Sequence, residues 1–307
     1  EYAGSIKKDE SQYDENLYYY VSKVALKCNL EPLSIEVLKL VEIGEEVYAL
    51  ENKKGNYIED NFYKVEFIDG KINILDKVNN RKLEDCLYIE ESGDDGDTYD
   101  SPPEEKYDFR YNLSFENGNV EVNNRNLHKD IKICGEFIVP ENLKERELNK
   151  RSTSIPYKLS LSLSNKGVIE CHLELDNNAD DHRMRIVLKT DVFSTESISD
   201  TAFGVIKRDN VPEHINDWRE LGWKEEPSPI YPMLHFAGIE DENSSATLLA
   251  KGIKEYEILD NSKIALTLFR GVGFLGKPDL IRRPGIASGN EFRYIETPDS
   301  QLRGKMK

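Results

Sequence analysis

The strongest constraint on the fold is a pair of alternating runs, Phe62–Ile68 and Lys71–Leu75, joined by Asp69-Gly70. Apolar and polar residues alternate in both runs, which places one face of each strand against a core and the other in water. Asp-Gly supplies the left-handed conformations that a two-residue hairpin turn needs. The sequence therefore predicts an antiparallel β-hairpin here.

Similar runs recur along the chain, separated by turn residues at about the 8–12-residue spacing that is typical of β-sandwiches. The predicted strands are Cys86–Glu91, Tyr107–Phe115, Ile131–Val139, Tyr157–Leu163, Val168–Leu175, Arg183–Leu188, Phe203–Ile206, Met233–Ile239, Ala246–Leu249 and Lys263–Phe269. Glu141–Arg151 and Glu213–Leu221 are each long enough for two helical turns, although the first is charged all round and also fits a solvated loop. The pattern predicts an all-β fold.

Two earlier runs, Leu17–Leu30 and Leu33–Glu42, flank a turn at Glu31-Pro32 and predict one more strand pair. The charged stretch Glu45–Asn56 then indicates a linker or a crossover connection. We therefore expect residues 1–50 to form the end of a small β-domain and a linker, and residues 51–307 to form the large β unit.

The net charge of −17 over 307 residues argues against binding to nucleic acid or to an anionic membrane surface, because both need a basic face. No apolar run approaches the roughly 20 residues of a membrane span, and no secretory signal opens the chain. The four cysteines lie far apart in apolar runs, without a CxxC pair. We therefore expect buried free thiols and a reducing, cytoplasmic location.

One strand shows how the pattern assigns faces. Its predicted core face carries Ile169, Cys171, Leu173 and Leu175, and these residues alternate with Glu and His. Because successive side chains of a strand point to opposite faces, we expect Cys171 to be buried and His172 to lie on the surface.

The run Gly93–Pro103, GDDGDTYDSPP, differs in kind from the strands around it. Gly, Asp and Pro are poor strand residues, so it predicts a tight acidic loop with Tyr99 at its tip. It does not match an EF-hand calcium loop: counted from Asp95, the fifth and sixth positions are Tyr99 and Asp100, where an acid and a glycine are needed. Loops held by a sheet often carry functional residues, and a solvated turn is the alternative.

The chain has no catalytic signature of its own. It lacks a GxSxG elbow, and its five histidines show no HxH or HExxH spacing for a metal. With 58 acidic residues, no pattern selects the two carboxylates that a glycosidase uses. We therefore predict neither catalytic nor metal-binding residues in this chain.

Two stretches combine glycine with arginine, Phe269–Gly273 (FRGVG) and Asp279–Gly289 (DLIRRPGIASG). Glycine lets backbone approach a ligand closely, and the arginine fork suits carboxylate, phosphate or vicinal hydroxyl groups. An irregular loop with surface arginines is the alternative.

Nine stretches carry a resemblance to a known family: Glu59–Gly70, Gly93–Pro103, Asp180–Arg185, Ser199–Val205, Trp218–Met233, Lys254–Ile258, Ala265–Gly273, Asp279–Gly289 and Thr297–Gly304. Their order resembles the C-terminal β-region of glycoside hydrolase family 38, the α-mannosidases. The likeness is greatest to the bacterial branch that includes mannosylglycerate hydrolases.

The resemblance implies a large antiparallel β super-sandwich of the galactose mutarotase-like type. It also implies a retaining, zinc-dependent parent enzyme whose N-terminal catalytic domain, absent from this chain, supplies the zinc ligands, the nucleophile and the acid. This chain alone is then expected to be inactive and to hold no cofactor. The family region extends past the TPDSQ-like stretch, so we expect the sandwich to be cut short at Lys307.

The resemblance also assigns site residues. A tyrosine from the family's equivalent loop reaches the sugar, and by motif position this is Tyr99, which can donate a hydrogen bond and cover a sugar face. The family's arginine near the glycine loop corresponds to Arg283, with Arg282 as the competing alignment. Asp95 and Asp97, together with Asp94, are expected to shape the loop or to bind sugar hydroxyls. The relatives' usual YDYSPP is one aromatic longer than the run in this chain.

These inferences predict a substrate-shaping domain that packs on its own catalytic domain and helps to form the pocket for an α-mannoside. A 6-phosphomannosyl-glycerate substrate of the parent stays open. The alternative is a stand-alone, non-catalytic carbohydrate-binding sandwich with an exposed aromatic platform, for which Trp218 and Trp223 are the tryptophan candidates. A purely structural sandwich, the third class, would not need the glycine and arginine loops.

Overall fold

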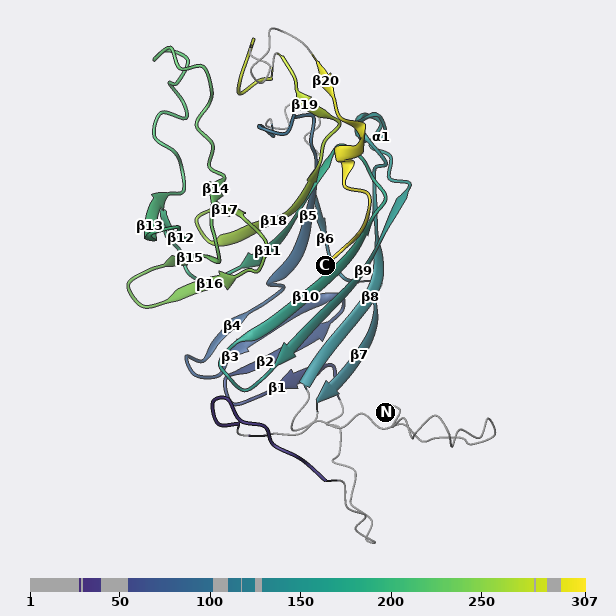
Figure 1. Ribbon diagram of the computed structural model, residues 1–307, viewed down its shortest axis with the longest axis vertical. Coiled ribbons are helices and arrows are strands. Elements are labelled where there is room, and N and C mark those ends of the chain that lie inside the picture. The colour runs from purple at the N-terminus through teal and green to yellow at the C-terminus, as the bar shows by residue number, and fades with distance from the viewer. Residues whose placement is uncertain are drawn as a thin grey trace, which may run out of the picture.

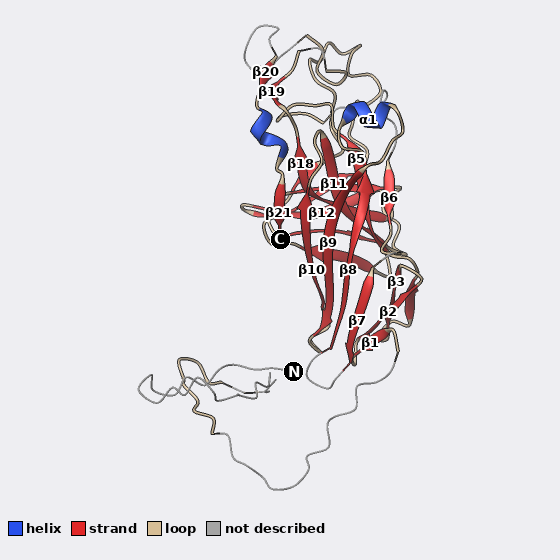
Figure 2. Cartoon of the chain, turned by 90° about the vertical axis from the view of Figure 1, so that its right-hand side faces the viewer, coloured by secondary structure: helices blue, strands red, loops and turns tan. Residues whose placement is uncertain are grey.

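The computed structural model describes residues 28, 30–39, 55–101, 110–116, 118–124, 129–278, 280–285 and 294–307 (Figure 1). Two large antiparallel sheets face each other across the main core, as Figures 1 and 2 show from two sides. Within the described residues, each named strand pairs antiparallel with its neighbours. The predicted all-β sandwich is confirmed.

The first large sheet has five strands. In order across the sheet they are β21 (Gly304–Met306), β10 (Ile169–Asn177), β9 (Thr153–Leu163), β8 (Lys129–Val139) and β7 (Asn119–Asn124). The second has six strands. In order they are β14 (Tyr231–Pro232), β17 (Glu255–Leu259), β18 (Lys263–Gly271), β11 (His182–Lys189), β5 (Leu87–Gly93) and β6 (Tyr111–Leu113).

Smaller elements complete the described fold. One four-stranded sheet consists of β1 (Tyr57–Glu59), β2 (Tyr63–Ile68), β3 (Lys71–Asp76) and β4 (Arg81–Leu83). Another consists of β13 (Gly204–Asp209), β12 (Glu196–Thr201), β15 (Phe236–Glu240) and β16 (Ser245–Leu249). The remaining elements are the pair β19 (Phe274–Gly276) and β20 (Ile295–Glu296), the helix α1 (Leu143–Glu147) and a 3-10 helix at Pro298–Gln301.

The core follows from the alternation of each strand. β9 buries every second side chain from Ile155 to Leu163, and these pack with Ile89 of β5, Met184 of β11 and Phe269 of β18. A second cluster joins the other part of the six-stranded sheet to β15 and β16. The opposite face of the six-stranded sheet carries a small apolar cluster of Tyr88, Val187 and Ala265 and, beyond it, charged side chains. The candidate site lies at the charged end of that face.

The predicted hairpin is confirmed. β2 and β3 pair from Tyr63↔Asp76 to Ile68↔Lys71, and the two turn residues have positive φ, 49° at Asp69 and 78° at Gly70. A Cβ on Gly70 would lie 2.4 Å from the Cα of Glu116, so glycine is required both by conformation and by space.

β10 fits its prediction only in part. His172 is exposed and Leu175 is buried, as expected, but Cys171 is exposed, which contradicts the prediction. The reason is that β21 covers only Leu175–Asn177, so that Ile169–Leu173 form a sheet edge within the described fold.

The cysteines are free, as predicted, but of the four only Cys86 is buried. Burial raises the pKa of the Cys86 thiol to about 12. Cys28, Cys134 and Cys171 are exposed, so the expectation of buried thiols was wrong for them. The protein atoms packed around the Cys171 thiol nevertheless raise its pKa to about 11. Cys134 lies opposite Lys158, on the face of its sheet that points away from the core.

Two further expectations need correction. Glu213–Leu221 forms successive turns and no helix: His214 near its start has a left-handed φ of 63°, and isolated α-type bonds join Trp218 N to the His214 carbonyl and Leu221 N to the Asp217 carbonyl. Residues 33–39 form no strand, and among the described residues they have no strand to pair with.

The remaining expectations can be checked only where they fall on described residues. Glu141–Arg151 contains the short helix α1, capped by the Asn142 side chain, which accepts a hydrogen bond from Glu145 N at 3.1 Å. Apart from residues 28 and 30, Leu17–Leu30 lies outside the described residues, and so does most of Tyr107–Arg110. The domain division near residue 50 stays a prediction. In the described part of the chain, no helix is long and apolar enough to span a membrane.

Candidate functional site

The acidic loop begins where β5 ends, at Gly93. Gly93 pairs with His182 of β11, and Asp94 N donates to the carbonyl of Asp181 at 2.9 Å. A Cβ on Gly93 would lie 2.6 Å from Cδ of Arg146, so a side chain would not fit there. Two strands and α1 therefore fix the base of the loop.

A buried polar network holds this base from the core side. Arg146 donates to the Glu91 carboxylate, and Nδ1 of His182 lies 3.2 Å from Glu91 Oε1. The other ring nitrogen of His182 lies 2.9 Å from Asn177 Oδ1, and the Asn177 amide donates to the carbonyls of Gln301 and Leu302. Since these side chains are buried, the network ties the loop rigidly to the C-terminal 3-10 helix.

Arg270, at the end of β18, clamps the loop from the other side. Its Nε and Nη2 donate to the two oxygens of Asp94, at 2.6 and 3.1 Å. Nη2 also donates to the carbonyls of Asp97 and Asp100, at 3.0 and 3.1 Å. The stretch FRGVG, predicted as a ligand contact or a surface arginine, thus provides the clamp of the acidic loop.

Asp97 is the centre of the loop and is completely buried. One carboxylate oxygen accepts from the backbone N–H groups of Tyr99 and Asp100, at 2.9 and 3.0 Å. The other accepts from Lys277 N at 3.0 Å and from the Arg283 guanidinium. Of the two roles expected for Asp97, its contacts support shaping of the loop.

Asp95 points to a different neighbour. It forms an ion pair with Lys277 Nζ at 2.7 Å and does not line the cavity described below. Thr98 adds two contacts to β19, one from its N–H to the Phe274 carbonyl and one from its hydroxyl to the Leu275 carbonyl. These bonds leave the tip of the loop as its free part.

Tyr99 stands at that tip with 64% of its surface exposed. The guanidinium carbon of Arg283 lies 5.8 Å from the centre of the Tyr99 ring, within cation–π range. Arg282 donates from Nη1 to the carbonyl of Ser101 at 3.3 Å. The structure therefore brings together Tyr99, Asp97, Arg282 and Arg283, which come from two loops far apart in the sequence.

Tyr99, Arg282 and Arg283 line a cavity of about 370 Å³, together with Asp100, Glu226 and Glu255. Burial raises the pKa of the Asp100 carboxyl, although Arg282 and Arg283 nearby act to lower it. Sequence reasoning missed the third wall, which is the segment 225–230. Glu226 N donates to the Arg282 carbonyl at 2.8 Å, and this bond joins that wall to the arginine loop.

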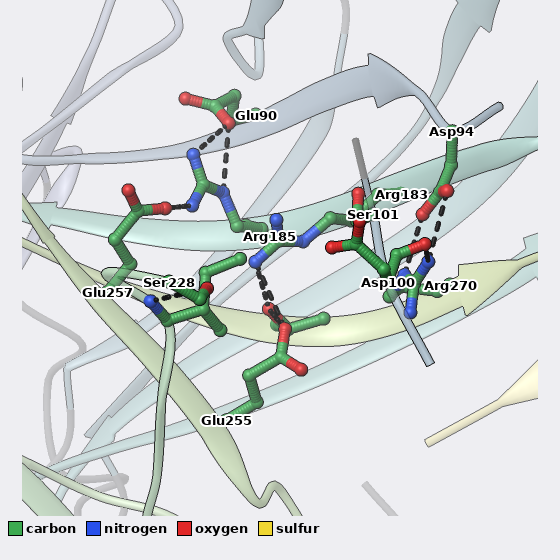
Figure 3. A network of polar contacts seen from close by, with 12 residues as sticks. Glu90, Asp94, Asp100, Ser101, Arg183, Arg185, Ser228, Glu255, Glu257 and Arg270 are labelled. Atoms are coloured by element: carbon green, nitrogen blue, oxygen red, sulfur yellow. Dashed lines mark hydrogen bonds and ion pairs between the residues drawn. The ribbon is translucent and has the colours of Figure 1, made fainter. Parts of the chain in front are cut away.

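From Glu255 and Arg270, which line the cavity, a row of charged side chains continues along the outer face of the six-stranded sheet (Figure 3). Arg183 donates from Nη2 to Glu255 at 3.0 Å and to the Thr267 hydroxyl at 2.9 Å. Arg185 donates from Nε to Glu90 at 2.9 Å and also contacts Glu257. Burial lowers the pKa of Arg183 to about 10.

This network was also missed, although the sequence contains a signal for it. Arginine occupies alternate positions of the strand, at 183 and 185, while Met184 between them faces the core. When charged residues alternate with residues that face the core, the charged residues lie together on the other face of the sheet. An arginine that is buried on that face needs a carboxylate partner, because an unpaired buried charge is costly.

A larger open cavity of about 590 Å³ lies elsewhere, between the turn at 76–81 and the turn at 240–245. It contains none of the predicted site residues. Across the described residues, no group of three or more His, Cys, Asp or Glu side chains is placed to hold a metal ion.

Comparison of the sequence and the fold with known proteins shows which protein family this chain belongs to. The sequence model described as "Glycosyl hydrolases family 38 C-terminal domain" matches residues 58–279, which is well over half of the chain. The chain belongs to this family. The resemblance inferred from the motifs is thereby confirmed.

Among its relatives is a protein of Halalkalibacterium halodurans that bears the provisional name mannosylglycerate hydrolase. It is 27% identical over 256 residues, which cover 77% of this chain and 26% of the relative. This family 38 chain thus spans about a quarter of the length of that curated relative.

Two solved structures share the fold. One is an α-mannosidase from Enterococcus faecalis V583, with a TM-score of 0.63 and 22% identity over 82% of this chain and 28% of that one. The other is a glycosyl hydrolase family 38 protein from Enterococcus faecalis, with a TM-score of 0.61 and 21% identity over 82% of this chain and 29% of that one.

Proposed function

We propose that this chain is the C-terminal β-domain of a zinc-dependent, retaining glycoside hydrolase of the α-mannosidase type. It packs on the N-terminal catalytic domain of its own full-length protein and forms one wall of the sugar pocket. Membership of family 38 and the names of the relatives support the type of enzyme. The full-length protein would hydrolyse α-mannosidic bonds, and the chain alone would be inactive.

The observation that carries the proposal is the placing of Tyr99. A solvent-exposed aromatic ring is supported by a loop whose Asp94 and Asp97 carboxylates are bonded through both oxygens, beside a cavity lined by arginines and carboxylates. Such a ring can cover the apolar face of a sugar while its hydroxyl bonds a sugar hydroxyl. Arg283 and Arg282 hold the wall behind the ring, Asp97 fixes the loop, and Asp95 anchors its outer side.

The charges of the wall favour an uncharged mannosyl unit. Arg270 is bonded to Asp94 and Arg283 to Asp97, while Arg282 lies between Asp100 and Glu226 at 4.0 and 3.7 Å. Each of these three arginines therefore faces a carboxylate of the protein. A phosphate dianion would compete with those carboxylates, so this wall suits sugar hydroxyls better than the phosphate of a 6-phosphomannosyl-glycerate.

The described residues do not fit a zinc site. We therefore assign zinc to the catalytic domain of the full-length protein, and the roles of Tyr99, Asp97 and Arg283 do not depend on it. The four free thiols support a reducing, cytoplasmic location. The net negative charge supports neither nucleic acid nor a membrane surface as a partner.

The rival function, a stand-alone carbohydrate-binding sandwich, loses one of its two tryptophan candidates. Trp218 is buried, with 3% of its surface exposed, and cannot form a sugar platform. Trp223 is half exposed and packs edge-on against the His214 ring at 5.3 Å. The structure favours the wall of a larger pocket over an isolated platform.

The test is hydrolysis of an α-mannoside by the full-length protein. Tyr99→Phe removes one hydrogen bond and is expected to lower kcat/KM by about tenfold, the equivalent of about 1.4 kcal/mol. Tyr99→Ala is expected to lower it further, because the ring contact is lost as well. Phe203→Ala is the matched control, since Phe203 is fully exposed and lies outside the cavity lining.

Equal activity of wild type and both Tyr99 variants would contradict the proposal. The same enzyme should prefer a plain α-mannoside over its 6-phosphate, and the reverse preference would overturn the assignment of the substrate class alone.

A further inference from the structure

His182 lies where two stretches of the candidate site meet the sheet. On one side it pairs with Gly93, where the acidic loop begins, and on the other with Gly271 of the FRGVG stretch. Its side chain is completely buried, and its ring packs edge-on against Phe269 with the two ring centres 5.3 Å apart. A buried imidazole has to bond both ring nitrogens to the protein, so its partners show where its hydrogens are.

The partner of Nε2 is the Asn177 side chain, whose amide orientation is fixed by its other contacts. Asn177 Nδ2 donates to the carbonyls of Gln301 and Leu302, at 3.2 and 3.1 Å. Asn177 Oδ1 accepts from Ala179 N at 3.0 Å. A flipped amide would set its oxygen against two carbonyls and its NH2 group against an N–H. The atom 2.9 Å from His182 Nε2 is therefore the amide oxygen, which can only accept, so Nε2 carries a hydrogen.

The partner of Nδ1 is the Glu91 carboxyl group, whose Oε1 lies 3.2 Å away. The Arg146 guanidinium donates to the same oxygen, so a proton on Oε1 would compete with it. Oε2 is buried and has no hydrogen-bond partner among the described residues, so a proton there would bond to nothing. Glu91 is therefore a carboxylate, which can only accept, and Nδ1 of His182 carries a hydrogen as well.

We propose that His182 is an imidazolium, protonated on both ring nitrogens, and that it is the positioning residue for the loop that carries Tyr99. The charged ring joins its own strand, β11, to Glu91 of β5 and to Asn177 of β10. The Glu91 carboxylate, which is held by Arg146 of α1, offsets the cost of burying the charge. A neutral ring would keep only one of the two bonds and would set a lone pair against an oxygen atom.

The network extends from the ring to the other end of the site. Through Asn177, His182 is connected to the carbonyls at the end of the 3-10 helix, and Gln301 of that helix bonds the Asp181 side chain at 2.7 Å. Figure 2 shows this helix and α1, both in blue, at the same end of the sheets. The role of His182 in positioning Tyr99 rests on the proposed function, whereas its charge state rests on the hydrogen bonds alone.

The charge state is tested by neutron diffraction from crystals of the perdeuterated full-length protein. At about pH 7.5 a free histidine is mostly neutral, since its pKa is about 6.5. We expect density for deuterium on both ring nitrogens of His182, and on one nitrogen only of His172, which is exposed on β10 and serves as the internal control. Deuterium on a single nitrogen of His182 would overturn the proposal.

The positioning role is tested by kcat/KM of the full-length protein for an α-mannoside. His182→Gln removes the charge and the rigid ring between the two partners. We expect kcat/KM to fall by about tenfold to a hundredfold, because a misplacement of about 1 Å in a binding site can cost about a hundredfold. In a Tyr99→Ala background the same substitution should cause little further loss, since His182 acts through Tyr99. His172→Gln is the matched control and should keep wild-type activity.

The outcomes separate this inference from the proposed function. Full activity of His182→Gln beside impaired Tyr99 variants would overturn the positioning role, and so would losses that simply add in the double variant. If the Tyr99 variants also keep wild-type activity, the proposed function fails, and deuterium on both nitrogens still supports the imidazolium. Should His182→Gln not fold, Asn177→Ala replaces it, because it removes only the partner of Nε2, and its loss should likewise vanish in the Tyr99→Ala background.

Discussion

Loss of Arg283 should destabilise the chain less than loss of Asp97, although the two side chains form one buried ion pair. The carboxylate of Asp97 is 0% exposed and Arg283 is 5% exposed. Removing one partner of a buried pair usually costs about 3–5 kcal/mol, because the other charge is left uncompensated. The two substitutions differ in the hydrogen-bond partners that they leave to the remaining side chain.

Arg283→Met leaves the Asp97 carboxylate with three backbone N–H donors, from Tyr99, Asp100 and Lys277. These donors offset part of the loss, so we expect the free energy of unfolding to fall by about 2–3 kcal/mol. Asp97→Ala removes the acceptor of all three N–H groups and also the partner of Arg283. We expect it to cost about 4–5 kcal/mol, with the double substitution costing less than the sum of the two.

Urea unfolding of the wild-type chain, the two single variants and the double variant measures these differences as shifts in midpoint at constant slope. Arg303→Met is the matched control, because Arg303 forms a bidentate but surface-exposed pair with Asp180 and should cost less than about 1 kcal/mol. An Arg283→Met variant as destabilised as Asp97→Ala, or additive costs in the double variant, would show that the backbone N–H donors do not stabilise the Asp97 carboxylate.

Three further predictions concern other parts of the chain. Gly70→Ala should lower the free energy of unfolding by about 2–3 kcal/mol, because the new Cβ would lie 2.4 Å from the Cα of Glu116. Gly252 also has a positive φ but has open space around it, so Gly252→Ala should lower the free energy of unfolding by only about 1 kcal/mol in the same urea experiment. The pKa of Glu145 is lowered from 4.5 to about 2 by its bonds to Lys150 and Ser152, so its contribution to stability is present above pH 4.5 and is lost as the pH falls towards 2. The Tm advantage of wild type over Glu145→Gln should accordingly shrink between pH 5 and pH 2, and a constant gap would contradict this. Iodoacetamide at pH 9 should modify the exposed Cys134 and leave Cys86 intact, since the Cys86 thiol is buried with a pKa of about 12; modification of Cys86 in the folded chain would show that its surroundings are open.

Local sequence signals predicted the parts of the fold that local physics determines. The Asp69-Gly70 hairpin was found because its turn and its alternation depend on adjacent residues only. Cys171 was placed wrongly because its burial depends on a strand from the far end of the chain, which the periodicity of β10 does not contain. Strand alternation tells which face a residue takes, but not whether a neighbour covers that face.

In the candidate site, too, features that depend on neighbouring residues were predicted and contacts between distant segments were missed. Composition predicted the acidic loop, and the resemblance placed Tyr99 and Arg283 in the site, where they lie together. The third wall at Glu225–Ile230 was missed because its contact with Arg282 joins two irregular loops 56 positions apart in the sequence, from Glu226 to Arg282. No periodic pattern or turn signal connects such segments.

The most direct test of the proposed function is a crystal structure of the full-length protein with an α-mannoside-type inhibitor bound. We predict that the sugar lies between the catalytic domain and this domain, with Tyr99 in van der Waals or hydrogen-bond contact, within about 4 Å of it. A sugar bound at a site with no residue of the Tyr99 loop or of Arg282–Arg283 nearby would contradict the proposed function and leave this domain a scaffold.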